Sequence, residues 1–389
     1  MAVPSMPSPA AIPDVAFLIT ESSYFLSHRR NLAEACRHAG WRTSLITNLG
    51  ETDRPALDAV AGLRVVPFDM RRASHNPLRE ILTIIRLVGV LRRERPRLLH
   101  AVGLKPVLYG AFAARILGLD AICALGGLGY LFTAGRRRPA AGLLRIAVVS
   151  WMRLMLGGGR IRVILQNDDD AAALLAHRIV TPERLVMVRG AGVDLDRFRP
   201  MPEPDGVPVF LVVSRMLADK GIREMVLAAR LLRRRKVPCR VVLVGDPDAD
   251  NSSALSRDQM AAWAAEGAVE WLGRRSDVAE LLAGSHVAVL PSYREGLPKS
   301  LLEAAAAGRP IITTDVPGCR AVVTDGVEGL LVPPRDWCAL ARAMERLALD
   351  GDLRRRMGRA ARRRAEAEFG DKVVTAQTME LYRRMLEAS

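Results

Sequence analysis

Short apolar runs alternate with helix-like segments along almost the whole of this 389-residue chain, and the alternation occurs twice. The first series starts at residues 15–20 and the second at residues 209–213. Between them lie four prolines, Pro200, Pro202, Pro204 and Pro208. Clustered prolines indicate a linker. Because strands that alternate with helices pair in parallel through right-handed crossovers, we predict two α/β domains, each with a parallel sheet.

The apolar periodicity predicts the individual elements. Predicted strands are residues 15–20, 43–47, 63–68, 97–101, 121–125, 162–166, 185–188, 209–213, 240–244, 269–272, 287–290, 311–314 and 329–332. Predicted helices are residues 27–39, 77–93, 106–117, 141–156, 168–178, 222–235, 256–266, 278–283, 299–307, 337–349, 353–368 and 372–386.

Positive charge is concentrated in the first half of the chain. Residues 1–200 contain 28 Lys and Arg against 16 Asp and Glu, whereas residues 201–389 contain 29 against 26. A basic field attracts anionic partners. The arginine clusters at 71–72, 92–95 and 136–138 lack interleaved aromatic residues, so we expect an anionic membrane surface as a partner and no nucleic acid. A general preference for arginine would give the same count.

The chain contains no run of eighteen uncharged apolar residues; the nearest, residues 140–159, is interrupted by Arg145 and Arg153. That segment suits either a basic helix lying in a bilayer interface or an ordinary packed helix. The first residues show no secretory signal, and the five cysteines stand singly, a pattern typical of a reducing compartment. We therefore expect a cytoplasmic protein, peripheral on the inner face of the plasma membrane.

The most informative stretch is residues 292–308, S-Y-R-E-G-L-P-K-S-L-L-E-A-A-A-A-G. It follows a predicted buried strand and runs through a loop into a helix, with Pro298 suited to the first helical turn and Gly308 to its end. A helix N-terminus of this kind favours an anionic ligand. Glu295 and Glu303 stand eight positions apart in the same stretch. The alternative is that both are solvated surface glutamates.

A second loop, S-R-M-L-A-D-K-G at residues 214–221, follows the first strand of the second series. Arg215 and Lys220 lie five positions apart, a spacing that lets both cations meet one diphosphate. They would then stabilise the charge that develops on a departing diphosphate. A pair of ordinary surface cations is the alternative.

These motifs together resemble those of the family 4 (group 1) retaining glycosyltransferases of the bacterial polysaccharide and lipid-linked glycan type. The resemblance covers nearly the whole chain and implies a GT-B fold, with the active site in the cleft between two Rossmann-like domains. It implies an acceptor-binding domain at residues 1–200, a nucleotide-sugar-binding domain at 208–370, and a C-terminal helix at 371–389 that returns to the first domain.

The resemblance assigns roles to individual residues. It implies that Glu295, Arg215 and Lys220 are catalytic, that Glu295 holds hydroxyls of the transferred sugar, and that Glu303 holds the ribose. The expected donor-binding residues are Arg215, Lys220, Arg274, Glu295, Gly296, Leu297, Pro298, Ser300 and Glu303. Arg274 lies in L-G-R-R-S-D-V, residues 272–278, which suits either a nucleobase contact or a simple helix cap. UDP is expected as the nucleotide, and the residues do not exclude GDP.

The first half holds the expected acceptor site. The segments 100–110 and 126–133 resemble the subgroup that extends polyprenyl-diphosphate-linked sugars, and the expected acceptor-binding residues are His28, His100, Lys105 and Gly127. Many members carry a His-Gly pair where this chain has Gly126-Gly127, which puts a catalytic histidine in doubt. A lone histidine is often purely structural.

No cofactor and no metal are expected. The run Asp168-Asp169-Asp170 is better explained by capping of a helix through Asn167 or Asp168. The run 246–251 lacks the Gly and the Glu that a calcium loop requires.

The predicted function is therefore metal-independent, retaining transfer of an N-acetylhexosamine or hexose from a UDP-sugar to a polyprenyl-diphosphate-linked saccharide. The alternatives are a glycosyltransferase with a soluble small-molecule acceptor and a UDP-sugar epimerase of GT-B fold.

Overall fold

The computed structural model describes residues 14–70, 76–128, 139–248 and 251–387, and these form two compact units. Unit 1 contains the described residues up to Leu165, then Ala171–Val188, then those from Thr375 onward. Unit 2 contains Gln166–Asp170 and Arg189–Val374. The arginines at 71–72 and 136–138 and the end of the Gly-rich segment, 129–133, lie outside the described residues.

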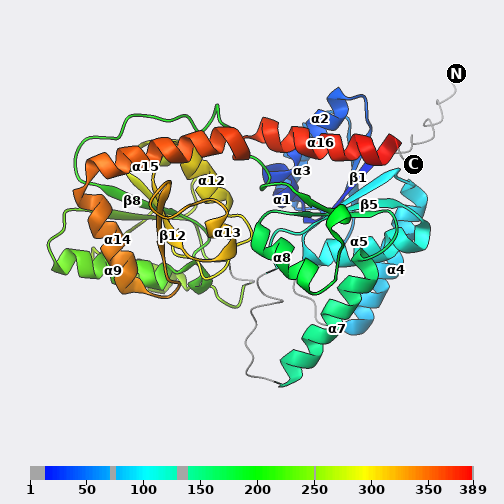
Figure 1. The fold of residues 1–389 in the computed structure, drawn as a ribbon, viewed down its shortest axis with the longest axis horizontal. Helices are drawn as coiled ribbons and strands as arrows, with labels where there is room; N and C mark the ends of the chain where they lie inside the picture. Colours follow the sequence, from blue (N-terminus) through cyan, green and yellow to red (C-terminus); the bar gives the residue numbers. More distant parts are fainter. Residues whose placement is uncertain (1–13, 71–75, 129–138, 249–250, 388–389) are drawn as a thin grey trace, which may run out of the picture. The chain divides into compact units, whose positions relative to one another are not determined.

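Unit 1 is built on a seven-stranded parallel sheet with the order β3-β2-β1-β4-β5-β6-β7 (Figure 1). Its strands are β1 (Val15–Glu21), β2 (Thr43–Asn48), β3 (Leu63–Pro67), β4 (Leu98–Val102), β5 (Asp120–Ala124), β6 (Ile161–Leu165) and β7 (Leu185–Met187). The helices of this part of the chain are α1 (Ser22–His28), α2 (Arg30–His38), α3 (Arg54–Asp58), α4 (Pro77–Glu94), α5 (Leu104–Leu117), α7 (Pro139–Leu156) and α8 (Asp168–Ala176).

Unit 2 is built on a six-stranded parallel sheet with the order β10-β9-β8-β11-β12-β13. Its strands are β8 (Val209–Val213), β9 (Arg240–Val244), β10 (Glu270–Trp271), β11 (Val287–Leu290), β12 (Ile311–Thr314) and β13 (Gly329–Val332). Its helices are α9 (Ile222–Arg234), α10 (Arg257–Ala265), α11 (Val278–Ala283), α12 (Lys299–Ala306), α13 (Pro317–Arg320), α14 (Trp337–Leu349) and α15 (Gly351–Arg364), and α16 (Asp371–Glu387) follows.

Alternation of side chains along β8 builds two cores in unit 2. Phe210 and Val212 point to one face of the sheet, where they join a cluster that includes residues of α9 and α14. Leu211 points to the other face and packs in a cluster with residues of α12. Both faces of the sheet are therefore covered, as the continuous apolar character of these strands requires.

The C-terminal helix α16 completes unit 1. Tyr382 is completely buried, the Cys36 thiol lies 3.7 Å from the sulfur of Met379, and Arg97 donates to the carbonyl of Leu386 at 2.9 Å. The last helix thus packs against residues from the start of the chain.

Three local features differ from the sequence expectations. The helix expected at 27–39 is two helices, α1 and α2, separated at Arg29, which leaves helical geometry at φ −135° and ψ −2°. The four-residue helix α13 was not expected, and the helix expected at 353–368 ends in a π-helical turn at Ala365–Phe369. Residues 189–200, expected in the first domain, lie in unit 2, where Val193 exchanges hydrogen bonds of 2.9 Å with Phe369 and Asp371.

Candidate functional site

The strand order of unit 2 reverses at β8, which has β9 on one side and β11 on the other. Parallel α/β sheets bind ligands at such a switch point, beyond the carboxyl ends of the strands. The loop after β8 carries Arg215 and Lys220, and the loop after β11 carries Glu295. The topology thus brings the two sequence motifs to the same edge of one sheet.

Backbone contacts lock these two loops together. The carbonyl of Asp219 accepts hydrogen bonds from the Tyr293 amide at 2.9 Å and from the Ser292 hydroxyl at 3.1 Å. Gly221 has φ +71°, and a Cβ atom at this position would lie 2.0 Å from the Pro291 carbonyl oxygen. Only glycine allows this backbone approach, so the position of Lys220, one residue earlier, depends on it.

Lys220 and Glu295 form an ion pair at the centre of the site. The Lys220 Nζ atom lies 2.5 Å from Glu295 Oε1, and the side chains are only 20% and 10% exposed. The Coulomb attraction between two charges that are so little exposed to solvent is stronger than between two charges on the surface. An anionic ligand could replace Glu295 as the partner of Lys220. The Glu295 carboxylate could then accept hydrogen bonds from other groups of the ligand.

Glu303 lies on α12 and is mostly buried. Burial raises the pKa of its carboxyl, while the positive charges of Lys299 and Arg197 lower it. The Lys299 Nζ atom lies 3.7 Å from Glu303 Oε1, and Arg197 also donates to the carbonyl of Ser276 at 3.1 Å. Arg197 was not predicted as a site residue, because nothing in its local sequence shows that it lies beside a glutamate more than a hundred positions later.

Arg215 and Arg274 have surroundings that differ from those of Lys220. Arg215 pairs with Asp248, in the loop after β9, and its side chain is 44% exposed. Arg274 lies in the loop after β10 and is exposed, while its neighbour Arg275 pairs with Asp277. Arg215 and Lys220, the two residues predicted to bind one diphosphate, are therefore paired with different carboxylates. A diphosphate bound to both would have to displace Asp248 as well as Glu295.

The predicted anion loop, Gly296 to Ser300, is held by neighbours far away in the sequence. The side-chain amide of Asn167 donates to the Gly296 carbonyl at 2.9 Å, and α12 begins at Lys299 without a side-chain cap. Gly318 of α13 approaches so closely that a Cβ there would lie 2.5 Å from the Glu295 and Gly296 carbonyl oxygens. Both Asn167 and Gly318 were missed as site residues, although the expected helix cap at Asn167 is confirmed by its 2.8 Å contact with the Asp170 amide.

In unit 1 the strand order reverses between β1 and β4, and three of the four predicted acceptor residues follow strands at this edge. His28 lies on α1 directly after β1, where it stacks on Tyr24 at 4.1 Å. Lys105 follows β4 and pairs with Glu80 at 2.7 Å. Gly127 follows β5 and is exposed, with φ +141°.

His100 lies within β4 and is 1% exposed. Its Nδ1 atom forms a short hydrogen bond with the hydroxyl of Tyr382, and its Nε2 atom has no hydrogen-bond partner among the described residues. Burial, with a smaller effect from Arg29, holds the pKa of this imidazole well below its usual value, so the ring is neutral. In this structure the hydrogen bond between His100 and Tyr382 joins β4 to α16. The predicted contact of His100 with an acceptor stays a prediction.

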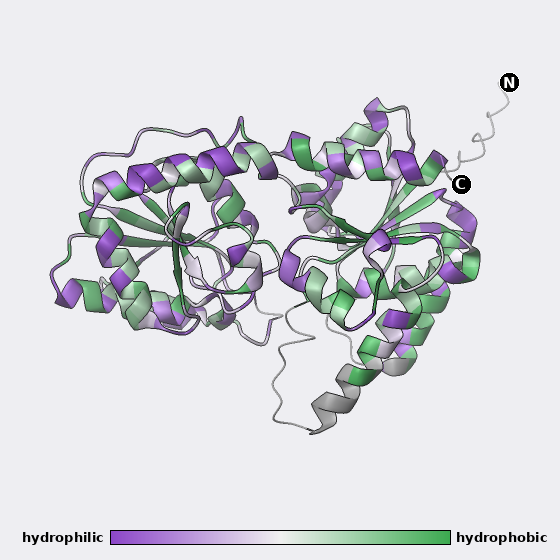
Figure 2. Cartoon of the chain, in the orientation of Figure 1, coloured by the Kyte–Doolittle hydropathy of each residue, from purple (hydrophilic) through white to green (hydrophobic). Residues whose placement is uncertain are grey.

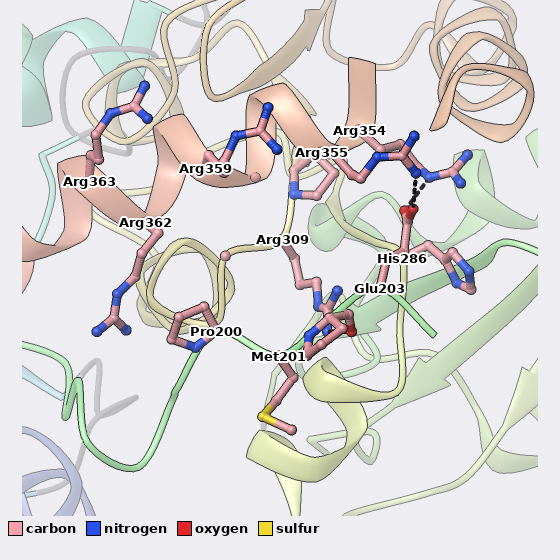
Figure 3. A pocket seen from close by; sticks show the side chains of 14 residues that line it. Pro200, Met201, Glu203, His286, Arg309, Arg354, Arg355, Arg359, Arg362 and Arg363 are labelled. Atoms are coloured by element: carbon pink, nitrogen blue, oxygen red, sulfur yellow. Dashed lines mark hydrogen bonds and ion pairs between the residues drawn. The ribbon is translucent and has the colours of Figure 1, made fainter. Parts of the chain in front are cut away.

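A separate pocket of about 460 Å³ lies in unit 2 around Pro200 to Glu203 (Figure 3). Arg309 donates to the Pro202 carbonyl at 3.2 Å, and Arg354 forms an ion pair with Glu203. None of the predicted donor residues lines it. The proline-rich segment predicted as a linker is thus packed against unit 2 by arginines.

The described residues offer neither a cluster of metal ligands nor a membrane-spanning helix. No group of three or more His, Cys, Asp or Glu side chains there is placed to hold a metal ion. In the same part of the chain, no helix combines the length and the apolar character needed to cross a bilayer.

Two family models match the chain. "Glycosyl transferases group 1" matches residues 195–364, and "Glycosyl transferase 4-like domain" matches residues 27–191, so that together they account for most of the sequence. A transferase of Campylobacter jejuni, N,N'-diacetylbacillosaminyl-diphospho-undecaprenol alpha-1,3-N-acetylgalactosaminyltransferase, is 27% identical over 84% of this chain and 87% of its own length. An Escherichia coli UDP-Gal:alpha-D-GlcNAc-diphosphoundecaprenol alpha-1,3-galactosyltransferase is 25% identical over 70% and 72%.

Solved structures show the same architecture. Anabaena HepE, crystallised with UDP and glucose, superposes with a TM-score of 0.75 at 18% identity, over 95% of this chain and 99% of that one. The two parallel-sheet units are therefore those of the GT-B fold. With this architecture, with both halves of the sequence matched and with Lys220 and Glu295 in contact at the switch point, the chain belongs to the group 1 glycosyltransferases.

Proposed function

We propose that this enzyme transfers a hexose or N-acetylhexosamine from a UDP-sugar to a saccharide on a polyprenyl diphosphate. The observation that carries the proposal is the Lys220–Glu295 ion pair at the β8–β11 switch point. Two curated relatives are named for undecaprenyl-diphosphate-linked acceptors, and a structural neighbour was crystallised with UDP. In this proposal unit 2 binds the donor and unit 1 the acceptor.

The donor would exchange charges within the site. Its diphosphate forms ion pairs with Lys220 and Arg215 in place of Glu295 and Asp248. Two cations then face the diphosphate oxygen from which the sugar is transferred. The α12 N-terminus, with Ser300 in its first turn, adds backbone dipoles for the same charge. Glu295, released from Lys220, then accepts hydrogen bonds from hydroxyls of the transferred sugar, and Glu303 accepts them from the ribose. The neighbouring loop with Arg274 is proposed to receive the nucleobase.

We propose that transfer retains the configuration of the sugar and needs no metal ion. The bond between the anomeric carbon and the diphosphate oxygen breaks while the acceptor hydroxyl approaches from the same face. A diphosphate oxygen takes the proton of that hydroxyl, so the bond to the acceptor forms without a protein base. Lys220 and Arg215 would stabilise the departing diphosphate, the role that a divalent cation has in other transferases.

The test combines binding with turnover. Each of several UDP- and GDP-sugars is added to the protein, and the correct donor raises its melting temperature by binding the native state, equivalent to about 2.7 kcal/mol at a hundredfold excess over Kd. Lys220→Met should abolish that shift and reduce transfer about 100- to 1,000-fold. Lys372→Met, which removes an 89% exposed lysine, is the matched control and should behave as the wild type.

The acceptor is tested by product analysis with a polyprenyl-diphosphate-linked saccharide, a soluble sugar phosphate, and donor alone. Transfer only to the lipid-linked saccharide is expected. Efficient transfer to the soluble compound would replace the proposed acceptor class, and conversion of the donor alone into an isomer would identify an epimerase. Normal turnover in Lys220→Met would overturn the assignment of the site.

A further inference from the structure

Helix α4 exposes a continuous apolar face. Leu78, Ile81, Leu82 and Ile85 are 73%, 53%, 52% and 60% exposed. They are spaced three and four positions apart, so they form one stripe along the first half of the helix. Four large side chains exposed together are unusual, whereas single exposed apolar residues are normal.

This face is opposite to the one that packs on the sheet. Leu87, Val90 and Leu91 are buried in the core of unit 1 and lie on the far side of the helix. Ile81 and Ile85 belong to the apolar periodicity that predicts a helix over residues 77–93. In the structure the first half of α4 directs both side chains to solvent.

Charge is sorted across α4 in the same way. Both of its acidic residues point inward and are paired: Glu80 with Lys105 at 2.7 Å, and Glu94 with Arg64 at 3.1 Å. Exposed arginines flank and continue the apolar stripe: Arg86, Arg92 and Arg93, together with Arg79, which pairs with Asp69 at 3.5 Å. The outward surface of α4 therefore combines large apolar side chains with positive charge and with neither of the helix's carboxylates.

Helix α7 extends the pattern. Ile146 and Leu154 are 63% and 57% exposed, and the half-exposed Trp151 stacks on Phe112 of α5 at 5.6 Å. Helix α5 also contacts α4, through the hydrogen bond from Tyr109 to Glu80. Figure 2 shows hydrophobic colour on α4 and on the coloured part of α7, two helices that Figure 1 labels on the same side of unit 1.

We propose that this surface, formed by the outward faces of α4 and α7, binds in the interface of an anionic bilayer. Apolar side chains such as Ile81, Ile85 and Leu154 would enter the boundary between headgroups and acyl chains, and the arginines would attract anionic headgroups. Charge complementarity favours a bilayer over a second copy of this chain, because a symmetric dimer through this surface would place rows of arginine against each other. The proposal concerns binding only and is independent of which sugar or acceptor the enzyme uses.

The experiment is vesicle flotation of the full-length protein. Vesicles of phosphatidylcholine alone are compared with vesicles that contain phosphatidylglycerol, at low ionic strength and in about 1 M salt, where the screening length falls to about 3 Å. Two double variants test the two components: Ile81→Ser with Ile85→Ser, and Arg86→Gln with Arg92→Gln. The controls in unit 2 are Leu349→Ser, at a side chain that is 68% exposed, and Arg342→Gln at an exposed arginine.

The wild type and both controls should float with the anionic vesicles and much less with phosphatidylcholine. Each arginine removed should lower partitioning about fivefold at low salt, and the serine pair should reduce it further, also in high salt. Flotation of both double variants like the wild type would overturn the proposal. So would a wild type that ignores anionic vesicles, or one whose self-association, measured by sedimentation, is abolished by the serine pair. Flotation requires no turnover, so its failure is distinguishable from failure of the proposed reaction.

Discussion

Gly221→Ala should destabilise unit 2 far more than an alanine at an otherwise similar glycine. The φ of +71° alone costs an alanine about 1–2 kcal/mol. The new Cβ would also lie 2.0 Å from the Pro291 carbonyl oxygen, so the loops after β8 and β11 must separate. Overpacking of this kind costs about 1–3 kcal/mol, and loss of the hydrogen bond between Tyr293 and Asp219 adds about 1 kcal/mol. The expected total is about 3–6 kcal/mol.

Gly326→Ala provides the matched control. Gly326 lies in the same unit with φ +78°, but a Cβ there has no neighbour within 4 Å, so only the backbone cost of about 1–2 kcal/mol applies. The reduced entropy of the unfolded chain is common to both variants and cancels in the comparison. Urea unfolding followed by tryptophan fluorescence measures the difference, since Trp263, Trp271 and Trp337 all lie in unit 2.

Activity gives a second measurement of the same substitution. Separation of the loops moves Lys220 away from Glu295, and a displacement of about 1 Å in a catalytic group can cost about 100-fold in rate. Gly221→Ala should therefore lose turnover even in conditions where it is folded, whereas Gly326→Ala should not. Equal destabilisation of the two variants, or full activity of Gly221→Ala, would show that the loop contact does not position the ion pair.

Three further predictions concern buried polar groups. Glu303→Gln should raise the melting temperature at pH 7 but not below the unfolded pKa of about 4.3. Folding raises the pKa of Glu303, so its charged form destabilises the native state, and this destabilisation grows as pH rises through the folded pKa. An advantage that persists at low pH would contradict this. Tyr382→Phe should cost about 1–3 kcal/mol by leaving the buried His100 without its partner and should speed proteolysis of α16; unchanged stability would argue against that contact. Asn167→Asp should cost about 3 kcal/mol or more at pH 7, because it places a second carboxylate beside Asp170, and it should raise the KM for the donor; a destabilisation that stays the same when the aspartate is protonated would contradict the charge argument.

The strands and the positions of the loops after β8 and β11 could be predicted because their signals are local. Residues 209–213, 240–244, 287–290, 311–314 and 329–332 match their strands to the residue, since each is a short, mostly apolar run with glycine, proline or a charged residue next to at least one end. That Lys220 and Glu295 lie at the same edge also follows from their local motifs, because the carboxyl ends of all strands of a parallel sheet lie at one edge.

The missed features depend on distant contacts or on very short segments. Arg197 and Asn167 are distant in sequence from the site residues beside which they lie. Gly318 is important only because α13 lies against the carbonyls of the Glu295 loop. Helix α13 has four residues, too few for a period to be recognised. The outward apolar face of α4 could not be predicted for a different reason: periodicity detects a stripe but does not tell which side of the helix meets the core.

The contacts of α16 also bear on the order in which the chain can fold. Most of unit 2 is one uninterrupted stretch, Arg189–Val374, so it has nearly all its parts while the C-terminal helix is still inside the ribosome. Unit 1 begins to emerge first, yet its buried Tyr382 arrives almost last. During synthesis the surface of the first sheet around His100 therefore stays uncovered until the C-terminal helix has left the ribosome and can pack on it.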